Sequence, residues 1–103
     1  MYGVIRRYSG NGAAQLMDVL EQNKDEIKRL IQGVNGFVSY ALIRTAEGGV
    51  SVTICQDKAG VDDSVRIARD WVQQNAPGTA GAPEVLEGEL SLSSSRPGYV
   101  CIA

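Results

Sequence analysis

Histidine is absent from this chain of 103 residues, and the sequence contains only two cysteines, one tryptophan and one phenylalanine. Without histidine, the protein lacks the commonest general base near neutral pH, the commonest metal ligand and the usual axial ligand of haem. Cys55 and Cys101 form neither a CxxC motif nor a metal-ligand spacing. We therefore expect two unpaired thiols in a reducing compartment, and no cofactor.

Long apolar runs are also missing, because no stretch approaches the ~20 residues that cross a bilayer. The N-terminus reads directly as a strand, with no basic segment followed by an apolar stretch as in a secretory signal. We expect a cytoplasmic protein that does not bind membranes. The net charge of −2 gives no support for broad electrostatic binding of nucleic acid, so no nucleic-acid partner is expected.

The residues that are present alternate between strand and helix patterns over about the first ninety positions. Strand patterns cover 2–8, 37–45, 50–56 and 84–92, and helical patterns cover 13–32 and 61–75. The order β-α-β-β-α-β is that of the ferredoxin-like fold. We predict one α+β domain over residues 1–92, with a four-stranded antiparallel sheet and two helices on one face, followed by a C-terminal tail at 93–103.

The central hairpin, with a predicted turn at Glu47-Gly48, indicates which side chains share a face of the sheet. One face is apolar and consists of Ala41, Ile43, Val50, Val52 and Ile54. The opposite face is mixed and consists of Val38, Tyr40, Leu42, Arg44, Ser51, Thr53 and Cys55. We expect the apolar face to lie under the helices and the mixed face to be bare, open to a partner or a ligand.

Polar residues near the predicted start of the second helix suit its N-terminus. At Asp62, Asp63 and Ser64, side-chain oxygens would accept hydrogen bonds from free N–H groups, and carboxylates would favour the helix dipole. Two adjacent carboxylates are too few for a metal site. The glycine-rich segment 9–12 also precedes a helix, but it matches neither nucleotide-binding fingerprint, and we interpret it as a turn.

Three segments, taken with the order of elements, resemble a known family. They are Gly36-Phe37-Val38-Ser39-Tyr40, Gly49-Val50-Ser51-Val52-Thr53-Ile54, and the stretch 56–64, which leads into a helix ending Asp70-Trp71-Val72. Together they resemble the dimeric α+β barrel superfamily, in particular its antibiotic-biosynthesis monooxygenase-like domains, and among these the small, functionally unassigned bacterial members. The resemblance covers about residues 1–92.

The resemblance implies a homodimer, in which two bare sheet faces close into a shared barrel. Some members of the superfamily oxidise aromatic polyketides or quinols without metal or flavin, which implies a small aromatic or anionic ligand. Others open haem with a histidine, an asparagine and a tryptophan. That pattern does not carry over, because the chain has no histidine and Trp71 lies within a predicted helix.

Arg6 and Arg7 are candidate ligand-binding residues, because they are adjacent in a strand that is central in this fold. Neighbouring residues of a strand point to opposite faces, and an arginine buried there needs a carboxylate or an anionic ligand. One interpretation is an anchor for a carboxylate or phenolate. The alternative is an ion pair with Glu87 or Glu89 on the last strand.

Tyr8, Tyr40 and Trp71 are the aromatic residues most suited to border a pocket. They would stack on a planar ligand while a hydroxyl or indole N–H orients it, although aromatic residues at such positions also serve as core. Two functions remain open: a monooxygenase-like enzyme without a cofactor, and a noncatalytic homodimeric module that binds a ligand or another protein.

Overall fold

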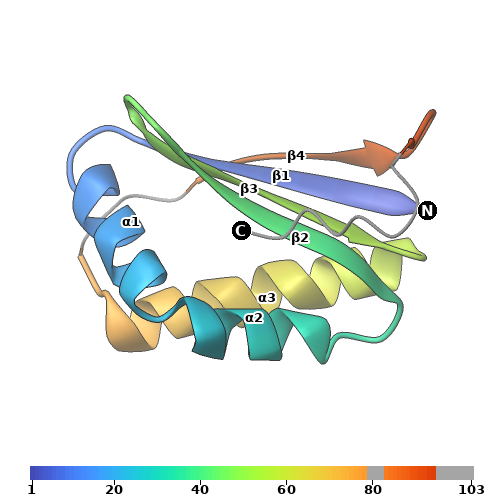
Figure 1. Cartoon of the computed structure of the whole chain (residues 1–103), viewed down its shortest axis with the longest axis horizontal. Coiled ribbons are helices and arrows are strands. Elements are labelled where there is room, and N and C mark those ends of the chain that lie inside the picture. The colour runs from blue at the N-terminus through green and yellow to red at the C-terminus, as the bar shows by residue number, and fades with distance from the viewer. Residues whose placement is uncertain (79–82, 95–103) are drawn as a thin grey trace.

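The computed structural model describes residues 1–78 and 83–94. The elements are β1 (Tyr2–Ser9), α1 (Ala13–Gln22), α2 (Lys24–Gln32), β2 (Phe37–Thr45), β3 (Gly48–Cys55), α3 (Lys58–Asn75) and β4 (Glu84–Glu89). The strands form one antiparallel sheet in the order β2-β3-β1-β4, with the helices on one side of it (Figure 1). This is the ferredoxin-like α+β fold predicted from the sequence. The predicted tail falls largely outside the described residues.

The single helix predicted over 13–32 is wrong, because the chain breaks at Asn23 into α1 and α2. The Asn23 side-chain amide donates to the carbonyl of Val19 at 2.8 Å, while the Asn23 carbonyl accepts the N–H of Ile27 at 3.1 Å. Asparagine side chains compete in this way with backbone hydrogen bonding, so one residue ends the first helix and begins the second. The helical layer therefore has three helices instead of two.

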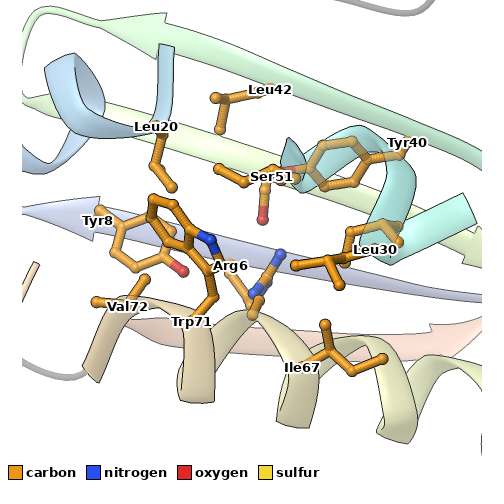
Figure 2. A pocket seen from close by; sticks show the side chains of 13 residues that line it. Arg6, Tyr8, Leu20, Leu30, Tyr40, Leu42, Ser51, Ile67, Trp71 and Val72 are labelled. Atoms are coloured by element: carbon orange, nitrogen blue, oxygen red, sulfur yellow. The ribbon is translucent and has the colours of Figure 1, made fainter. Parts of the chain in front are cut away.

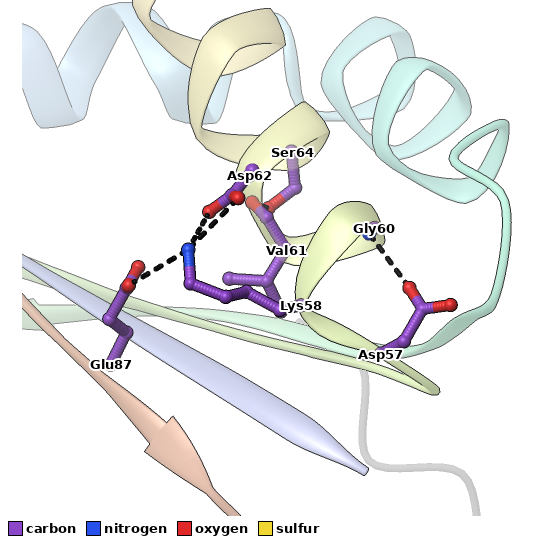
Figure 3. A network of polar contacts seen from close by, with 7 residues as sticks. All are labelled: Asp57, Lys58, Gly60, Val61, Asp62, Ser64 and Glu87. Carbon is purple, nitrogen blue, oxygen red and sulfur yellow. Dashed lines mark hydrogen bonds and ion pairs between the residues drawn. The ribbon is translucent and has the colours of Figure 1, made fainter.

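The cap predicted at 62–64 is also wrong, because α3 begins one turn earlier, at Lys58. Asp57 is the N-cap residue, and its carboxylate accepts the N–H of Gly60 at 3.0 Å (Figure 3). Lys58 then forms ion pairs with Asp62 at 3.0 Å and with Glu87 at 3.4 Å. The second of these pairs connects the start of α3 to strand β4.

Two strand boundaries differ from the prediction for clear reasons. Strand β3 begins at Gly48, which pairs with Thr45, so the hairpin turn is Ala46-Glu47. Gly48 has a φ of 151°, and any side chain there would collide with the carbonyl of Tyr8, so only glycine fits. Strand β4 ends at Glu89 instead of residue 92, because Glu89 lies opposite Tyr2, the first residue of β1.

The composition of the two sheet faces is confirmed except at Val38, which lies exposed where the register shifts between Phe37 and Ser39, but the placement of the faces is the reverse of the prediction. The mixed face, with Tyr40, Ser51 and Thr53 buried, lies under the helices. None of the described elements covers the opposite face, which is apolar; we call it the bare face, and it consists of Ile5, Ala41, Ile43, Val50, Val52, Ile54 and Leu86. Ile43 is 51% exposed and Leu86 59% exposed. Alternation along a strand fixes which residues share a face, but it does not say which face the helices cover.

Candidate functional site

A small cavity lies between the mixed face of the sheet and the helices, and we call it the inner cavity (Figure 2). Its volume is about 20 Å³, which is room for one water molecule or one oxygen atom of a ligand. Its polar lining comes from Arg6, Tyr8, Tyr40, Ser51 and Trp71, and its other walls are apolar side chains, mostly from the helices. The site is therefore a polar recess inside an apolar core.

Three polar atoms of the inner cavity are buried without a hydrogen-bond partner among the residues described: Arg6 Nε, Ser51 Oγ and Trp71 Nε1. Arg6 is only 3% exposed. The arginine and indole N–H groups can only donate, whereas the serine hydroxyl can donate or accept. Two groups that can only donate and one hydroxyl, with no carboxylate in the lining, make this cavity suited to an oxygen atom, above all a negatively charged one.

The Tyr40 hydroxyl belongs to the same polar group. Burial raises the pKa of Tyr40 above its usual value of 10.0, and the nearby positive charge of Arg6 lowers it by a smaller amount. The phenol is therefore protonated at neutral pH, and it acts as a hydrogen-bond donor instead of a base. This adds one more donor to the cavity.

The two adjacent arginines have different surroundings. Arg6 points into the inner cavity, whereas Arg7 lies on the opposite side of β1 and forms an exposed ion pair with Glu84 at 3.2 Å. The alternative pairing of an arginine with Glu87 or Glu89 is not formed within residues 1–78 and 83–94, where Glu87 pairs with Lys58. Only one of the two predicted arginines is thus placed at the site.

The three predicted aromatic residues are all buried around the inner cavity. Figure 2 shows Tyr8 and Trp71 beside one another, with the indole nitrogen directed toward Arg6, and Tyr40 at the other end. Trp71 is presented by α3, and its carbonyl accepts from the side chain of Asn75 at 2.9 Å. The structure thus gathers Arg6, Tyr8, Tyr40 and Trp71, while their role in ligand binding stays a prediction.

A second, larger hollow of about 220 Å³ adjoins the inner cavity, and we call it the vestibule. The two share four lining residues: Leu20, Ile27, Tyr40 and Leu42. The vestibule also carries Glu21, Lys24 and Lys28 from α1 and α2. The two lysines were not predicted from the sequence, because charged residues on a helix usually face solvent. The only signal was their spacing of one helical turn on either side of the buried Ile27, which places both along one edge of the helix.

Two features are absent from the described part of the chain. No cluster of three or more histidine, cysteine, aspartate or glutamate side chains there is arranged to hold a metal ion. No helix there has the length and apolar character that crossing a membrane requires.

Comparison with solved structures shows that the chain shares its fold with two oxygenases, a haem degrader and a protein of unknown function, which is the fold implied by the resemblance to antibiotic-biosynthesis monooxygenase-like domains. A protein of unknown function from Nitrosomonas europaea is 18% identical, with 94% of each chain covered and a TM-score of 0.69. The ActVA-Orf6 monooxygenase of Streptomyces coelicolor, solved with nanaomycin D, is 17% identical over 92% of this chain and 90% of its own, with a TM-score of 0.60.

The haem degrader MhuD of Mycobacterium tuberculosis, solved with two haems in its active site, is 17% identical to this chain. The match covers 92% of this chain and all of MhuD, with a TM-score of 0.64. Neither the family models nor the curated proteins give a match. These similarities establish a shared fold, within which the residues of the site must carry the argument about function.

Proposed function

We propose that the inner cavity binds the anionic oxygen of a small aromatic molecule, and that the protein is a monooxygenase-like enzyme that acts without a cofactor. The observation that carries this proposal is the buried guanidinium of Arg6, whose Nε has no partner among the described residues and lies with two further unpaired groups. Burying a guanidinium that has an unsatisfied N–H and no carboxylate in the lining of its cavity is expensive, so an anionic ligand would explain its presence. The apolar walls of the adjoining vestibule supply the contact for a planar ring.

The chemistry follows from the charge of Arg6. A nearby positive charge favours the deprotonated form of a bound phenol or enol, and the resulting anion is electron-rich. An anthrone is a suitable substrate class: its anion transfers one electron to dioxygen, and the two radicals join through a new C–O bond. Cleavage of the O–O bond and loss of the second C–H proton then yield a quinone and one water from each anthrone and dioxygen.

The test is oxygen uptake with 1,8-dihydroxyanthrone, followed together with quinone formation. We expect wild-type protein to consume one dioxygen for each quinone at a rate well above the uncatalysed reaction. Arg6→Met should remove at least nine-tenths of this rate, because the anion loses its partner. Arg7→Met is the matched control, since that arginine is exposed on the opposite side of the strand. Equal rates for these two variants would contradict the proposed role of Arg6.

A noncatalytic ligand-binding module is the second candidate, and the lining of the inner cavity favours it. The titratable residues in that lining are Arg6, Tyr8 and Tyr40, and none of them is a carboxylate or a histidine that could serve as a general base. Binding of an aromatic anion with 1:1 stoichiometry, without oxygen uptake, would identify the protein as such a module.

We also propose a homodimer formed through the bare face, with the protein acting in the cytoplasm. An antiparallel sheet with one solvated face normally turns polar residues outward, whereas here the outward residues are apolar. The apolar part of this face carries no charged residue, and Arg7 at its border is already paired with Glu84. A second copy supplies the same uncharged surface, as a two-fold interface requires. The buried, unpaired thiol of Cys55 suits a reducing compartment.

A further inference from the structure

We infer that the ligand carries two anionic groups at opposite ends of an aromatic body, with the second group bound by Lys24 and Lys28 at the mouth of the vestibule. This inference rests on the proposed function, because it places the first anionic group at Arg6. It adds a second binding site within the same molecule, and it narrows the ligand to an elongated aromatic dianion.

The two hollows differ in size. The inner cavity, at about 20 Å³, holds a single oxygen-sized group, so the rest of any ligand must lie elsewhere. The vestibule, at about 220 Å³, exceeds the ~150 Å³ of an engineered cavity known to hold benzene. One or two aromatic rings therefore fit there, between Leu20, Ile27 and Leu42.

The two hollows are connected through the lining residues that they share. Tyr40 lines both of them, so its side chain lies where the vestibule meets the polar recess. A ring in the vestibule would thus direct one end toward Arg6, and its other end would face the residues of the outer rim.

The outer rim carries two positively charged side chains. Lys24 and Lys28 lie one helical turn apart, on either side of Ile27, and both line the vestibule. Within the described residues neither lysine forms an ion pair or a side-chain hydrogen bond. The two ammonium groups are therefore free to bind a carboxylate or another anion.

Two acidic residues of α1 are already engaged. Glu21, the acidic residue of the vestibule lining, accepts a hydrogen bond from Arg44 Nε at 3.0 Å. Asp18 accepts from Arg44 Nη2 at 2.6 Å. These carboxylates hold Arg44 against α1, so among the described residues the two lysines are the unpaired charged groups of the vestibule lining. The rim can therefore attract an anion, and Arg6 supplies a positive charge in the adjoining inner cavity.

The experiment compares matched pairs of probes by isothermal titration calorimetry. One pair is 2-naphthoate and 2,6-naphthalenedicarboxylate, and the other is biphenyl-4-carboxylate and biphenyl-4,4′-dicarboxylate, which has a longer span. In wild-type protein we expect the better-fitting dicarboxylate to bind about fivefold to tenfold more tightly than its monocarboxylate. One or two partly exposed ion pairs provide a gain in affinity of about this size. This difference should shrink as salt is added.

The variant K24Q/K28Q should remove that difference while leaving the affinity for the monocarboxylates unchanged. The control is R66Q/R69Q, which changes the net charge by the same amount on α3, where both arginines are exposed and outside the vestibule lining. We expect this control to retain the wild-type preference for the dicarboxylate.

The possible failures are distinguishable. If both members of each pair bind wild-type protein equally, or if the two double variants behave alike, the second site is overturned while the proposed function stands. If no aromatic anion binds wild-type protein, the proposed function fails at Arg6, and this inference fails with it. Loss of monocarboxylate binding in R6M, with an unchanged dicarboxylate preference in R7M, would support both the proposed function and the second binding site.

Discussion

At the level of single residues, the inner cavity holds polar atoms that reduce the stability of the fold. An unpaired buried donor or acceptor costs about 1–3 kcal/mol. Arg6, Ser51 and Trp71 each contribute one such atom, and they share one cavity. A core selected only for stability would contain apolar residues at these positions. Their clustering in one cavity is the feature that supports the proposed binding site.

Ser51 and Thr53 provide a direct comparison, because both hydroxyls are buried and unpaired while only Ser51 lines the inner cavity. We expect Ser51→Ala and Thr53→Val each to raise the free energy of unfolding in urea by about 1 kcal/mol, since each removes an unsatisfied polar atom. Ser51→Ala should also weaken binding of 2-naphthoate at least fivefold, and Thr53→Val should not. Equal effects of the two substitutions on binding would contradict the assignment of the site.

Tyr40 gives a prediction for alkaline pH. Because burial raises the pKa of this phenol above 10.0, the folded state holds its proton more tightly than the unfolded state does. The stabilisation that Tyr40 contributes is fully present below pH 10 and is lost as the pH rises above it. We expect wild-type protein to lose more unfolding free energy between pH 8 and pH 11 than Tyr40→Phe does. An equal loss in both proteins would show that Tyr40 ionises without hindrance in the folded state.

At the level of the elements, the sequence predicted the order of the elements and the four strands well, but helix ends poorly. Strand β2 has the predicted bounds, because its β-branched and aromatic residues end at a turn with glycines. The break at Asn23 was missed, because an asparagine within an apolar stripe is compatible with a continuous helix until its side chain bonds the carbonyl of Val19. The sequence pattern alone does not distinguish a continuous helix from one that breaks at Asn23.

The N-cap of α3 is the element-level feature most open to test. Asp57→Ala should lower the free energy of unfolding by about 1 kcal/mol, because the N–H of Gly60 loses its acceptor. Asp57→Asn retains an acceptor oxygen and should cost much less. Asp63→Ala, at an exposed position within the helix, should change stability by less than ~0.5 kcal/mol. If Asp63→Ala proved the more damaging, the cap predicted from the sequence would be correct after all.

Gly60 also sets how closely α3 approaches the sheet. A Cβ atom there would lie 2.6 Å from the carbonyl oxygen of Asn35 and 3.0 Å from the Cβ of Cys55. Alanine normally favours a helix over glycine by ~1 kcal/mol, but overpacking costs about 1–3 kcal/mol. We expect Gly60→Ala to lower the melting temperature, whereas Gly88→Ala, which has open space around it, should have little effect. A rise in melting temperature for Gly60→Ala would mean that the contact relaxes freely.

At the level of the whole molecule, the two faces of the sheet reverse the usual arrangement. Arg6, Ser51 and Thr53 are buried under the helices, while Ile5, Ile43 and other aliphatic residues face outward. The sequence predicted the membership of each face because side chains alternate along strands. It did not predict the orientation, because a polar residue in a binding cavity and a polar residue facing water give the same alternation. Likewise, it selected both Arg6 and Arg7 but could not say which one is buried.

This reversed arrangement leads to the prediction of a homodimer. A contiguous apolar surface of this kind is a liability for a monomer, and a second copy would cover it with an identical surface. We expect sedimentation of the wild-type protein to give a mass twice the 11.0 kDa of one chain. Ile43→Glu should shift the equilibrium to the monomer, because it places a charge within the apolar bare face.

Ala14→Glu is the control, since it adds the same charge at an exposed position of α1, on the helical side of the molecule. It should leave the dimer intact. A wild-type mass of one chain at every concentration would overturn the dimer, and the bare face would then need another cover. If Ile43→Glu becomes monomeric yet still binds 2-naphthoate, the inner cavity is complete within one chain, as expected for a site whose walls all lie on the opposite side of the sheet.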